Sequence, residues 1–141
     1  MYRNRQVEPD RSEITGTPRI LAVDDVHLTA PPEAAEEVRR FYAELIGFEP
    51  LQAESSEQRL AFRAFPRSGP RLYVRVTGER SDPLKRRQLL VQVAGLSARA
   101  QAFRERGLEP QWSHGWSPYD RRLGVQDPAG NRVELVAYHV L

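Results

Sequence analysis

An internal repeat constrains the fold of this chain more than any other feature of its sequence. Similar landmarks recur after 60 or 61 residues along most of its length. The paired landmarks are His27 with Gln88, Gly47 with Gly107, Gly69 with Gly130, and Tyr73 with Glu134. A fixed period of this kind indicates that one supersecondary unit occurs twice. A chain of 141 residues has room for two such units around a shared core.

The first copy is predicted to contain a strand, a helix and three further strands. Residues 20–29 are rich in aliphatic residues and predict the first strand. Pro31 and Pro32 then favour the start of a helix, and Gly47 favours its end. Between them, apolar residues recur at the spacing of one buried helix face: Val38, Phe41, Tyr42 and Leu45.

The second copy shows the same order of elements. Ser97 is a candidate helix cap, and Gly107 is the corresponding helix stop. Each copy then ends in a predicted hairpin, formed by residues 60–65 and 71–77 in the first copy and by residues 123–126 and 132–138 in the second. The sequence therefore predicts an α+β fold built from two βαβββ modules.

Composition narrows the kind of protein. The formal net charge is +2 and arginines alternate with acids, so we expect no nucleic-acid partner. No apolar stretch is long enough for a bilayer, which predicts no membrane partner. The absence of cysteine excludes disulfides and fits a cytoplasmic location. Residues 1–18 are expected to form a polar tail or an added strand before one domain, residues 19–141, with module one at 19–80 and module two at 85–141.

One turn in the second copy resembles a known family. The segment Asp127-Pro-Ala-Gly-Asn-Arg-Val-Glu-Leu resembles the Asp-Pro-x-Gly-Asn-x-x-Glu-Leu hairpin near the end of proteins of the vicinal oxygen chelate superfamily. That superfamily includes glyoxalase I, fosfomycin-resistance enzymes, extradiol dioxygenases and bleomycin-binding proteins. The resemblance covers residues 20–138 and implies that the two modules form a cupped mixed sheet with helices on its outer face. It implies a small-molecule site, but no one reaction.

The resemblance also implies a metal site on the concave face, with ligands from the first and last strands. Carried over by position, the ligands are His27, Gln88 and Glu134, and the fourth place holds Tyr73. Imidazole and carboxylate suit Zn(II), Mn(II), Ni(II) or Fe(II), whereas the amide is a poorer donor. Glu134 and Tyr73 are then the candidate catalytic residues. The alternative is that His27 is a hydrogen-bonded histidine within the sheet and Glu134 a surface acid.

Alternation along the strands predicts which other side chains face the cup. If Tyr73 faces inward, Arg75 does too, and the same rule places Arg63 and Gln92 there. Guanidinium groups in a partly dry cavity favour carboxylate or phosphate partners, so we expect an anionic or strongly polar small-molecule ligand. The alternative is that Arg63 and Arg75 pair with acids across the sheet or with a partner subunit.

Residues 111–120 contain both tryptophans of the chain and are predicted to form a loop. Loops of such folds vary their specificity. Trp112, Trp116 and Tyr119 are candidates for an apolar wall over a ligand, and His114 is a candidate for moving a proton. The alternative is that the loop packs its tryptophans into a dimer interface or into the seam between modules.

Two functions remain open from the sequence. The first is a metal-dependent enzyme of the glyoxalase type, a lyase, isomerase or transferase acting on a polar or anionic substrate. The second is a metal-free protein that binds and sequesters a drug or metabolite, as the bleomycin-binding members do. His27 and Glu134 favour the first, whereas Gln88 and Tyr73 favour the second. The resemblance also implies a homodimer, and no feature identifies the substrate.

Overall fold

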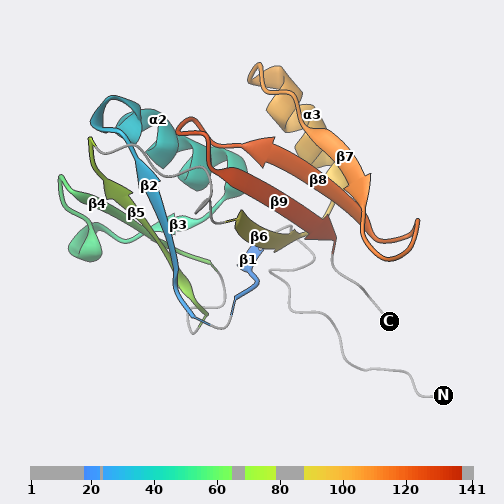
Figure 1. The fold of residues 1–141 in the computed structure, drawn as a ribbon, viewed down its shortest axis with the longest axis horizontal. Coiled ribbons are helices and arrows are strands. Elements are labelled where there is room, and N and C mark those ends of the chain that lie inside the picture. Colours follow the sequence, from blue (N-terminus) through green and yellow to red (C-terminus); the bar gives the residue numbers. More distant parts are fainter. Residues whose placement is uncertain (1–17, 23, 65–68, 79–87, 138–141) are drawn as a thin grey trace.

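The fold comes from a computed structural model that describes residues 18–22, 24–64, 69–78 and 88–137 (Figure 1). Its strands are β1 (Arg19–Ile20), β2 (Val26–Ala30), β3 (Glu49–Pro50), β4 (Arg59–Arg63), β5 (Arg71–Val76), β6 (Gln88–Val93), β7 (Gln111–His114), β8 (Arg121–Gln126) and β9 (Arg132–Ala137). Its helical segments are η1 (Pro32–Ala34), α2 (Ala35–Arg40), η2 (Phe41–Ile46), η3 (Gln52–Glu54) and α3 (Leu96–Glu105). The predicted tail lies outside the described residues except for Pro18.

The strands form two sheets that share one connectivity. One sheet has the order β2-β5-β4-β3, and the other has the order β1-β6-β9-β8-β7. In each module the first strand pairs parallel with the last, and the last two strands pair antiparallel. The remaining strand, β3 or β7, pairs antiparallel at the outer edge. Apart from β1, the two sheets therefore repeat one βαβββ topology, which confirms the α+β fold predicted from the repeat.

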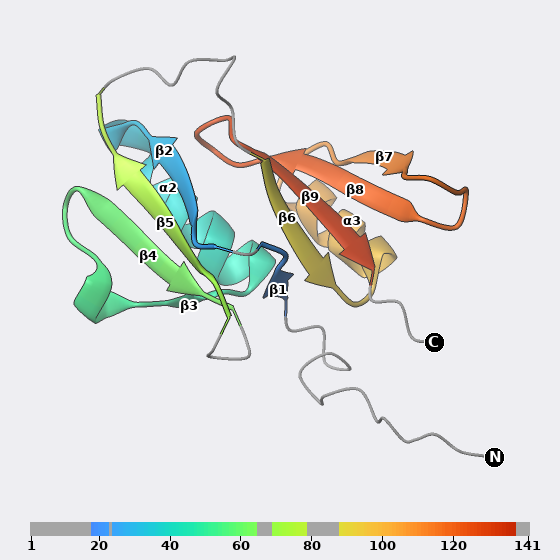
Figure 2. The same cartoon turned by 60° about the horizontal axis from the view of Figure 1, so that its bottom comes forward.

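The two sheets lie side by side, with α2 and α3 on the same side of both (Figure 2). Together they form a cup whose outer side carries the helices. Alternate strand residues are buried beneath the helices, namely Leu28 and Ala30 on β2, Leu72 and Val74 on β5, and Leu89, Val91 and Val93 on β6. Their neighbours in sequence therefore project from the side of each sheet that has no helices. None of the described helices is both long and apolar enough to cross a membrane.

The strand predicted at residues 20–29 is two strands in the structure. β1 pairs antiparallel with β6 of module two, whereas β2 pairs parallel with β5 of module one. Two exposed acids, Asp24 and Asp25, separate them, and Asp25 Oδ1 accepts the backbone N–H of Arg71 at 2.8 Å. Because polar residues interrupt the apolar pattern at this point, the chain leaves one sheet and enters the other.

The helical segment of module one, which runs from η1 through α2 to η2, begins and ends where the prolines and the glycine predicted. Pro31 precedes η1 and Pro32 opens it, and α2 then continues as one stretch of π-helix, η2. Gly47 follows with φ 95°, and the N–H groups of Gly47 and Phe48 both donate to the carbonyl of Tyr42. This closes the helix in the left-handed conformation that glycine adopts at least cost.

We expect Gly47→Ala to lower the free energy of unfolding by about 1–2 kcal/mol, because a left-handed conformation strains an L-residue. An added Cβ would lie 3.6 Å from Pro18 Cδ, an ordinary contact, so the cost arises in the backbone. Urea denaturation measures the change. Gly78 has no positive φ and open space around its Cα, which makes Gly78→Ala the matched control. Equal denaturation midpoints for the two variants would contradict this account.

Two predictions for module two are wrong. Helix α3 starts at Leu96 after Gly95, so Ser97 lies within the first turn and makes no capping hydrogen bond. Residues 111–114 are not a loop but strand β7, paired antiparallel with β8. All four residues of β7 are exposed because it is the edge strand, and the alternation of apolar residues that marks a half-buried strand is therefore missing.

The turn after β8 joins the two modules. Asp127 is buried, and its Oδ2 accepts the hydroxyl of Tyr42, on η2 of module one, at 2.6 Å. Asn131 Nδ2 donates to the carbonyl of Thr29 on β2 at 2.9 Å. The turn that carries the sequence resemblance therefore also makes polar contacts between the modules, as do Arg99 and Arg106 of module two with module one.

Candidate small-molecule site

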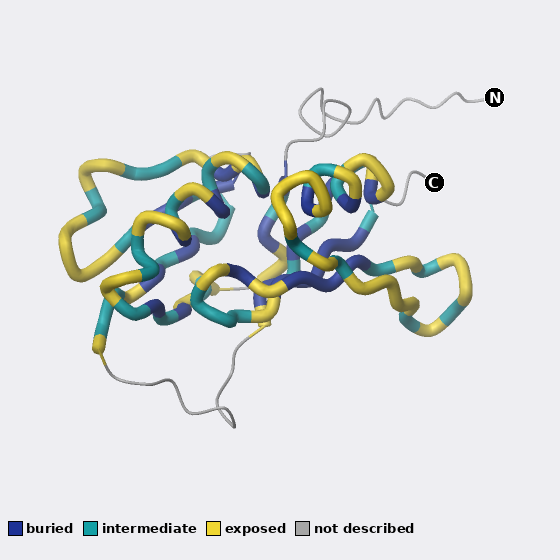
Figure 3. The backbone as a smooth tube through the Cα atoms, turned by 90° about the horizontal axis from the view of Figure 1, so that it is seen from above, coloured by how far each residue is buried: buried dark blue, intermediate teal, exposed yellow. Residues whose placement is uncertain are grey.

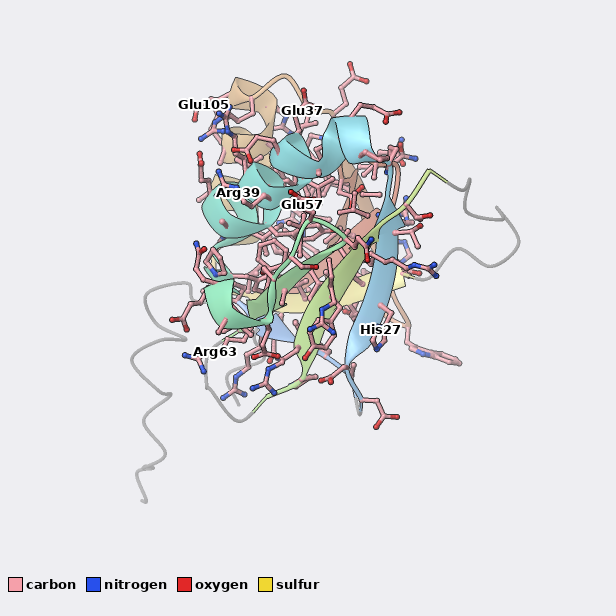
Figure 4. All side chains as sticks on the ribbon, turned by 90° about the vertical axis from the view of Figure 1, so that its left-hand side faces the viewer. His27, Glu37, Arg39, Glu57, Arg63 and Glu105 are labelled. Carbon is pink, nitrogen blue, oxygen red and sulfur yellow. The ribbon has the colours of Figure 1, made fainter. Side chains whose placement is uncertain are left out.

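The helix-free side of the module-one sheet is called here the open face of module one. It carries His27 and Thr29 on β2, Arg59, Ala61 and Arg63 on β4, and Arg71, Tyr73 and Arg75 on β5. His27 and Arg63 lie at opposite sides of this sheet, away from Glu37 and Arg39 on the helical layer (Figure 4). The inward orientation predicted for Tyr73, Arg75 and Arg63 agrees with this face.

Three side chains on this open face form a stack across neighbouring strands. The ring of His27 stacks on Tyr73 with centroids 5.4 Å apart and planes 24° apart. On the other side, Arg59 Cζ lies 4.8 Å from the centroid of the Tyr73 ring. This His27–Tyr73–Arg59 stack presents a ring at the sheet edge and a guanidinium further in. A cation over an aromatic face is favourable, and most so when it is desolvated.

Tyr73 is held in place by an acid that the sequence did not indicate. Its hydroxyl donates to Glu54 Oε1 at 2.8 Å, and Arg71 Nε lies 3.2 Å from Glu54 Oε2. Partial burial, followed by the hydrogen bond and charge of Glu54, raises the pKa of Tyr73 above its usual value. The phenol of Tyr73 is therefore protonated at neutral pH, and its O–H is used in the hydrogen bond to Glu54. In this arrangement the Tyr73 ring supports His27 and Arg59, and its oxygen is bonded to Glu54.

Arg63 has an acidic partner across the sheet, which was the predicted alternative to a role in ligand binding. Its Nε lies 2.7 Å from Glu49 Oε1 on the paired strand β3. The same hydrogen bond raises the pKa of the Arg63 guanidinium, although the pair is partly exposed. Arg63 therefore contributes its charge to the face together with a neutralising neighbour.

The helix-free side of the module-two sheet is called the open face of module two. It carries Gln88, Leu90, Gln92, Gln111, Ser113, Arg122, Gly124, Gln126, Arg132, Glu134 and Val136. Gly124 lies opposite Glu134, and the guanidinium of Arg132 fills the space that a side chain at Gly124 would need. A cavity of about 430 Å³ opens beside them, and Glu109, Gln111 and Gln126 add to its polar lining.

Glu134 lies at the centre of a polar network on this face. It is 9% exposed, its Oε2 accepts the amide N–H of Gln88, and its Oε1 lies 3.4 Å from Arg122 Nη1. Arg122 also reaches Asp120 Oδ2 at 3.3 Å. The hydrogen bond to Asp120, and then that to Glu134, raise the pKa of the Arg122 guanidinium. Both carboxylate oxygens of Glu134 are therefore engaged, one of them by a permanent cation.

The donor set that the resemblance implies for a divalent metal does not fit this arrangement. A metal ion on Glu134 would approach a carboxylate that Arg122 already neutralises, and like charges repel strongly where water is scarce. Gln88 directs an N–H donor at Glu134, and His27 stacks on Tyr73. Within residues 18–22, 24–64, 69–78 and 88–137, no three His, Cys, Asp or Glu side chains lie close enough together to hold a metal ion.

The aromatic residues of the β7–β8 hairpin lie away from Glu134. Trp112 is paired with Leu123, and Arg121 Cζ lies 4.1 Å from its ring, so Trp112 faces the helix side of the sheet. By alternation His114 shares that side. Trp116 and Tyr119, at the tip, are 102% and 91% exposed, and the hairpin projects from the body of the molecule (Figure 3). Neither tip residue packs into the seam between the modules.

Three residues of this site were missed by sequence reasoning. Arg59 and Arg122 continue the alternation of β4 and β8, but both strands begin one or two residues earlier than the apolar pattern indicated. Glu54 comes from the short segment η3, for which the sequence carries no periodic signal. A search for charged residues just outside each predicted strand would have found the two arginines.

Comparison with known proteins defines the fold. No protein-family model and no curated protein sequence matches this chain. Among solved structures, one similar to it is a glyoxalase family protein from Bacillus anthracis, with 27% identity and a TM-score of 0.66, covering 85% of this chain and 97% of that one.

Two further structures show where this fold occurs. A lactoylglutathione lyase from Agrobacterium tumefaciens has 15% identity and a TM-score of 0.63, covering 83% of this chain and 93% of that one. TnmS3, an antibiotic binding protein from a Streptomyces species, has 21% identity and a TM-score of 0.61, covering 84% and 98%. These structures include both enzymes and binding proteins. The chain therefore has the fold of the glyoxalase and bleomycin resistance proteins, and its resemblance to the vicinal oxygen chelate superfamily is confirmed at the level of the fold.

Proposed function

We propose that this protein binds a polar or anionic small molecule on the open faces of its two sheets and does so without a metal ion. The observation that carries the proposal is the state of Glu134, whose two oxygens are taken by Arg122 and Gln88. A carboxylate with a guanidinium partner is a poor metal ligand, because the ion would have to displace or face that charge. A binding role is in keeping with TnmS3, an antibiotic binding protein with the same fold.

The charges on the open face of module one favour an anion as the ligand. Module one contributes the four arginines of β4 and β5, whereas in module two Arg132 shares the lining of the cavity near Gly124 with Glu109, so the preference for an anion comes from module one. Guanidinium groups bind carboxylate and phosphate through paired hydrogen bonds. The amides of Gln88, Gln92 and Gln126 add donors and acceptors that fix the orientation of a polar ligand. The homodimer expected from the resemblance stays part of the proposal, and the exposed Trp116 and Tyr119 offer apolar surface for it.

The proposal is tested by ligand binding with and without metal. We expect some members of a panel of organic acids, their amides and uncharged aromatic drugs to raise the melting temperature in EDTA. The same compounds should give the same rise after addition of Zn(II), Mn(II), Ni(II) or Fe(II), because Arg122 already neutralises Glu134. Thermal melts and elemental analysis of protein purified without chelator provide the two measurements.

Two variants complete the test of the metal-free proposal. His27→Ala and Glu134→Ala should have the same low metal content as the unchanged protein. The proposal fails if the protein carries a stoichiometric metal that both variants lose, and if compounds raise the melting temperature only of the metal-loaded protein. That result would instead support the metal-dependent enzyme.

A further inference from the structure

The four arginines on the open face of module one form two directly opposed pairs. Arg63 lies opposite Arg71, and Arg59 lies opposite Arg75, on the paired strands β4 and β5. Like charges directly opposite one another destabilise a sheet. A neutralising neighbour or a bound anion would relieve this repulsion.

The first pair has neutralising neighbours. Arg63 Nε lies 2.7 Å from Glu49 Oε1, and Arg71 Nε lies 3.2 Å from Glu54 Oε2. The second pair differs, since no acid among the described residues lies within ion-pair distance of Arg59 or Arg75. Both side chains belong to exposed residues. One of two similar pairs is thus compensated within the chain, and the other is open to solvent.

Arg59 is positioned without being neutralised. Its Nε and Nη2 donate to the carbonyl oxygen of Glu54 at 3.1 and 2.9 Å, and its guanidinium lies over the ring of Tyr73. A guanidinium has five N–H donors, so the edge formed by Nη1 and the second Nη2 proton keeps its capacity for a two-oxygen partner. A cation held in place with a free edge loses little conformational freedom when it binds an anion.

We infer that Arg59 and Arg75 together bind the anionic group of the ligand. Arg59 and Arg75 are paired residues on β4 and β5, so their side chains project from the same open face. The ligand class is therefore a carboxylate or phosphate. This inference rests on the proposed function and adds the ligand class and the residues that select it.

The test is calorimetric titration in EDTA with four matched probes. These are 2-naphthoate, 2-naphthamide, decahydronaphthalene-2-carboxylate and 2-naphthyl phosphate. We expect 2-naphthoate to bind about tenfold more tightly than the amide, which lacks the charge, because a charge-assisted hydrogen bond is worth more than a neutral one. It should bind about as tightly as the saturated acid, because the two arginines bind the carboxylate and not the ring. The phosphate distinguishes the two anion chemistries, and preference for either one supports the inference.

Variants locate the site. Arg59→Gln and Arg75→Gln should each weaken the binding of 2-naphthoate about tenfold, whereas Arg104→Gln on α3, an exposed arginine on the helical side, should leave it unchanged. Melting temperature supplies an independent readout. Arg75→Gln should melt at a higher temperature than the unchanged protein at low salt, because it removes one of two opposed charges, so that weaker binding is not a sign of misfolding.

The outcomes separate this inference from the proposed function. Equal affinity for 2-naphthoate and 2-naphthamide would overturn the inference, while metal-free binding of a small molecule would stand. Binding that is unaffected in both Arg59→Gln and Arg75→Gln would overturn it as well, by placing the anion elsewhere. Failure of all four probes to bind would also reject this ligand class, and the wider panel in EDTA would still decide the proposed function.

Discussion

Asp127→Ala should lower the free energy of unfolding by about 3–5 kcal/mol, a large share of the stability of a small domain. Asp127 is buried, and its Oδ2 accepts the hydroxyl of Tyr42 at 2.6 Å and the Nδ2 of Asn131 at 2.9 Å. Its Oδ1 accepts the backbone N–H groups of Ala129 and Asn131 at 2.8 and 2.9 Å. The variant removes all four acceptor contacts, and it leaves the fully buried Tyr42 hydroxyl without a partner.

Graded variants separate the parts of this effect. Tyr42→Phe removes one donor and leaves the turn intact, so it should cost about 1–2 kcal/mol. Glu105→Gln, on the exposed side of α3, is the control and should change nothing measurable. Urea denaturation measures all three. If Asp127→Ala were no more destabilising than Tyr42→Phe, the three hydrogen bonds that Asp127 accepts within its own turn would contribute nothing to stability.

The topology of this protein could be predicted because the same order of strand, helix and hairpin signals occurs twice in the sequence. Landmarks such as Gly47 and Gly107 end the two helices with positive φ, at 95° and 80°. Alternation then separated the buried Leu72 and Val74 from Tyr73 on the opposite face. Such signals are local, because a turn or a strand constrains its own residues whatever lies beyond them.

What the sequence could not predict depends on partners far along the chain. β1 pairs with β6 because a sheet edge is available there, which no pattern at residues 19–20 indicates. The contact between Tyr42 and Asp127 spans 85 positions. The engagement of Glu134 by Arg122 follows from the register of β8 and β9, and a position-by-position comparison with a family gives a residue its place but not its neighbours. The comparison with the family therefore gave no sign of the contact between Glu134 and Arg122.

Arg122→Leu should lower the free energy of unfolding by about 2–4 kcal/mol, because it leaves the carboxylate of Glu134 buried without its guanidinium. The double variant Arg122→Leu with Glu134→Leu should recover most of that loss, since two apolar side chains need no partner there. Arg63→Leu, which breaks the more exposed pair with Glu49, should cost about 0–1 kcal/mol and is the matched control. Chemical denaturation of the four proteins gives the comparison.

Recovery in the double variant would show that the Arg122–Glu134 pair adds little to the free energy of unfolding. The pair would then have a role in the site rather than in stability. Arg122 supplies a fixed positive charge there and keeps Glu134 from binding a cation. In that case Arg122→Leu alone should acquire a rise in melting temperature on addition of Zn(II) or Mn(II) that the unchanged protein lacks. If the double variant were as unstable as the single one, the pair would be structural, and the charge state of Glu134 would say nothing about metal binding.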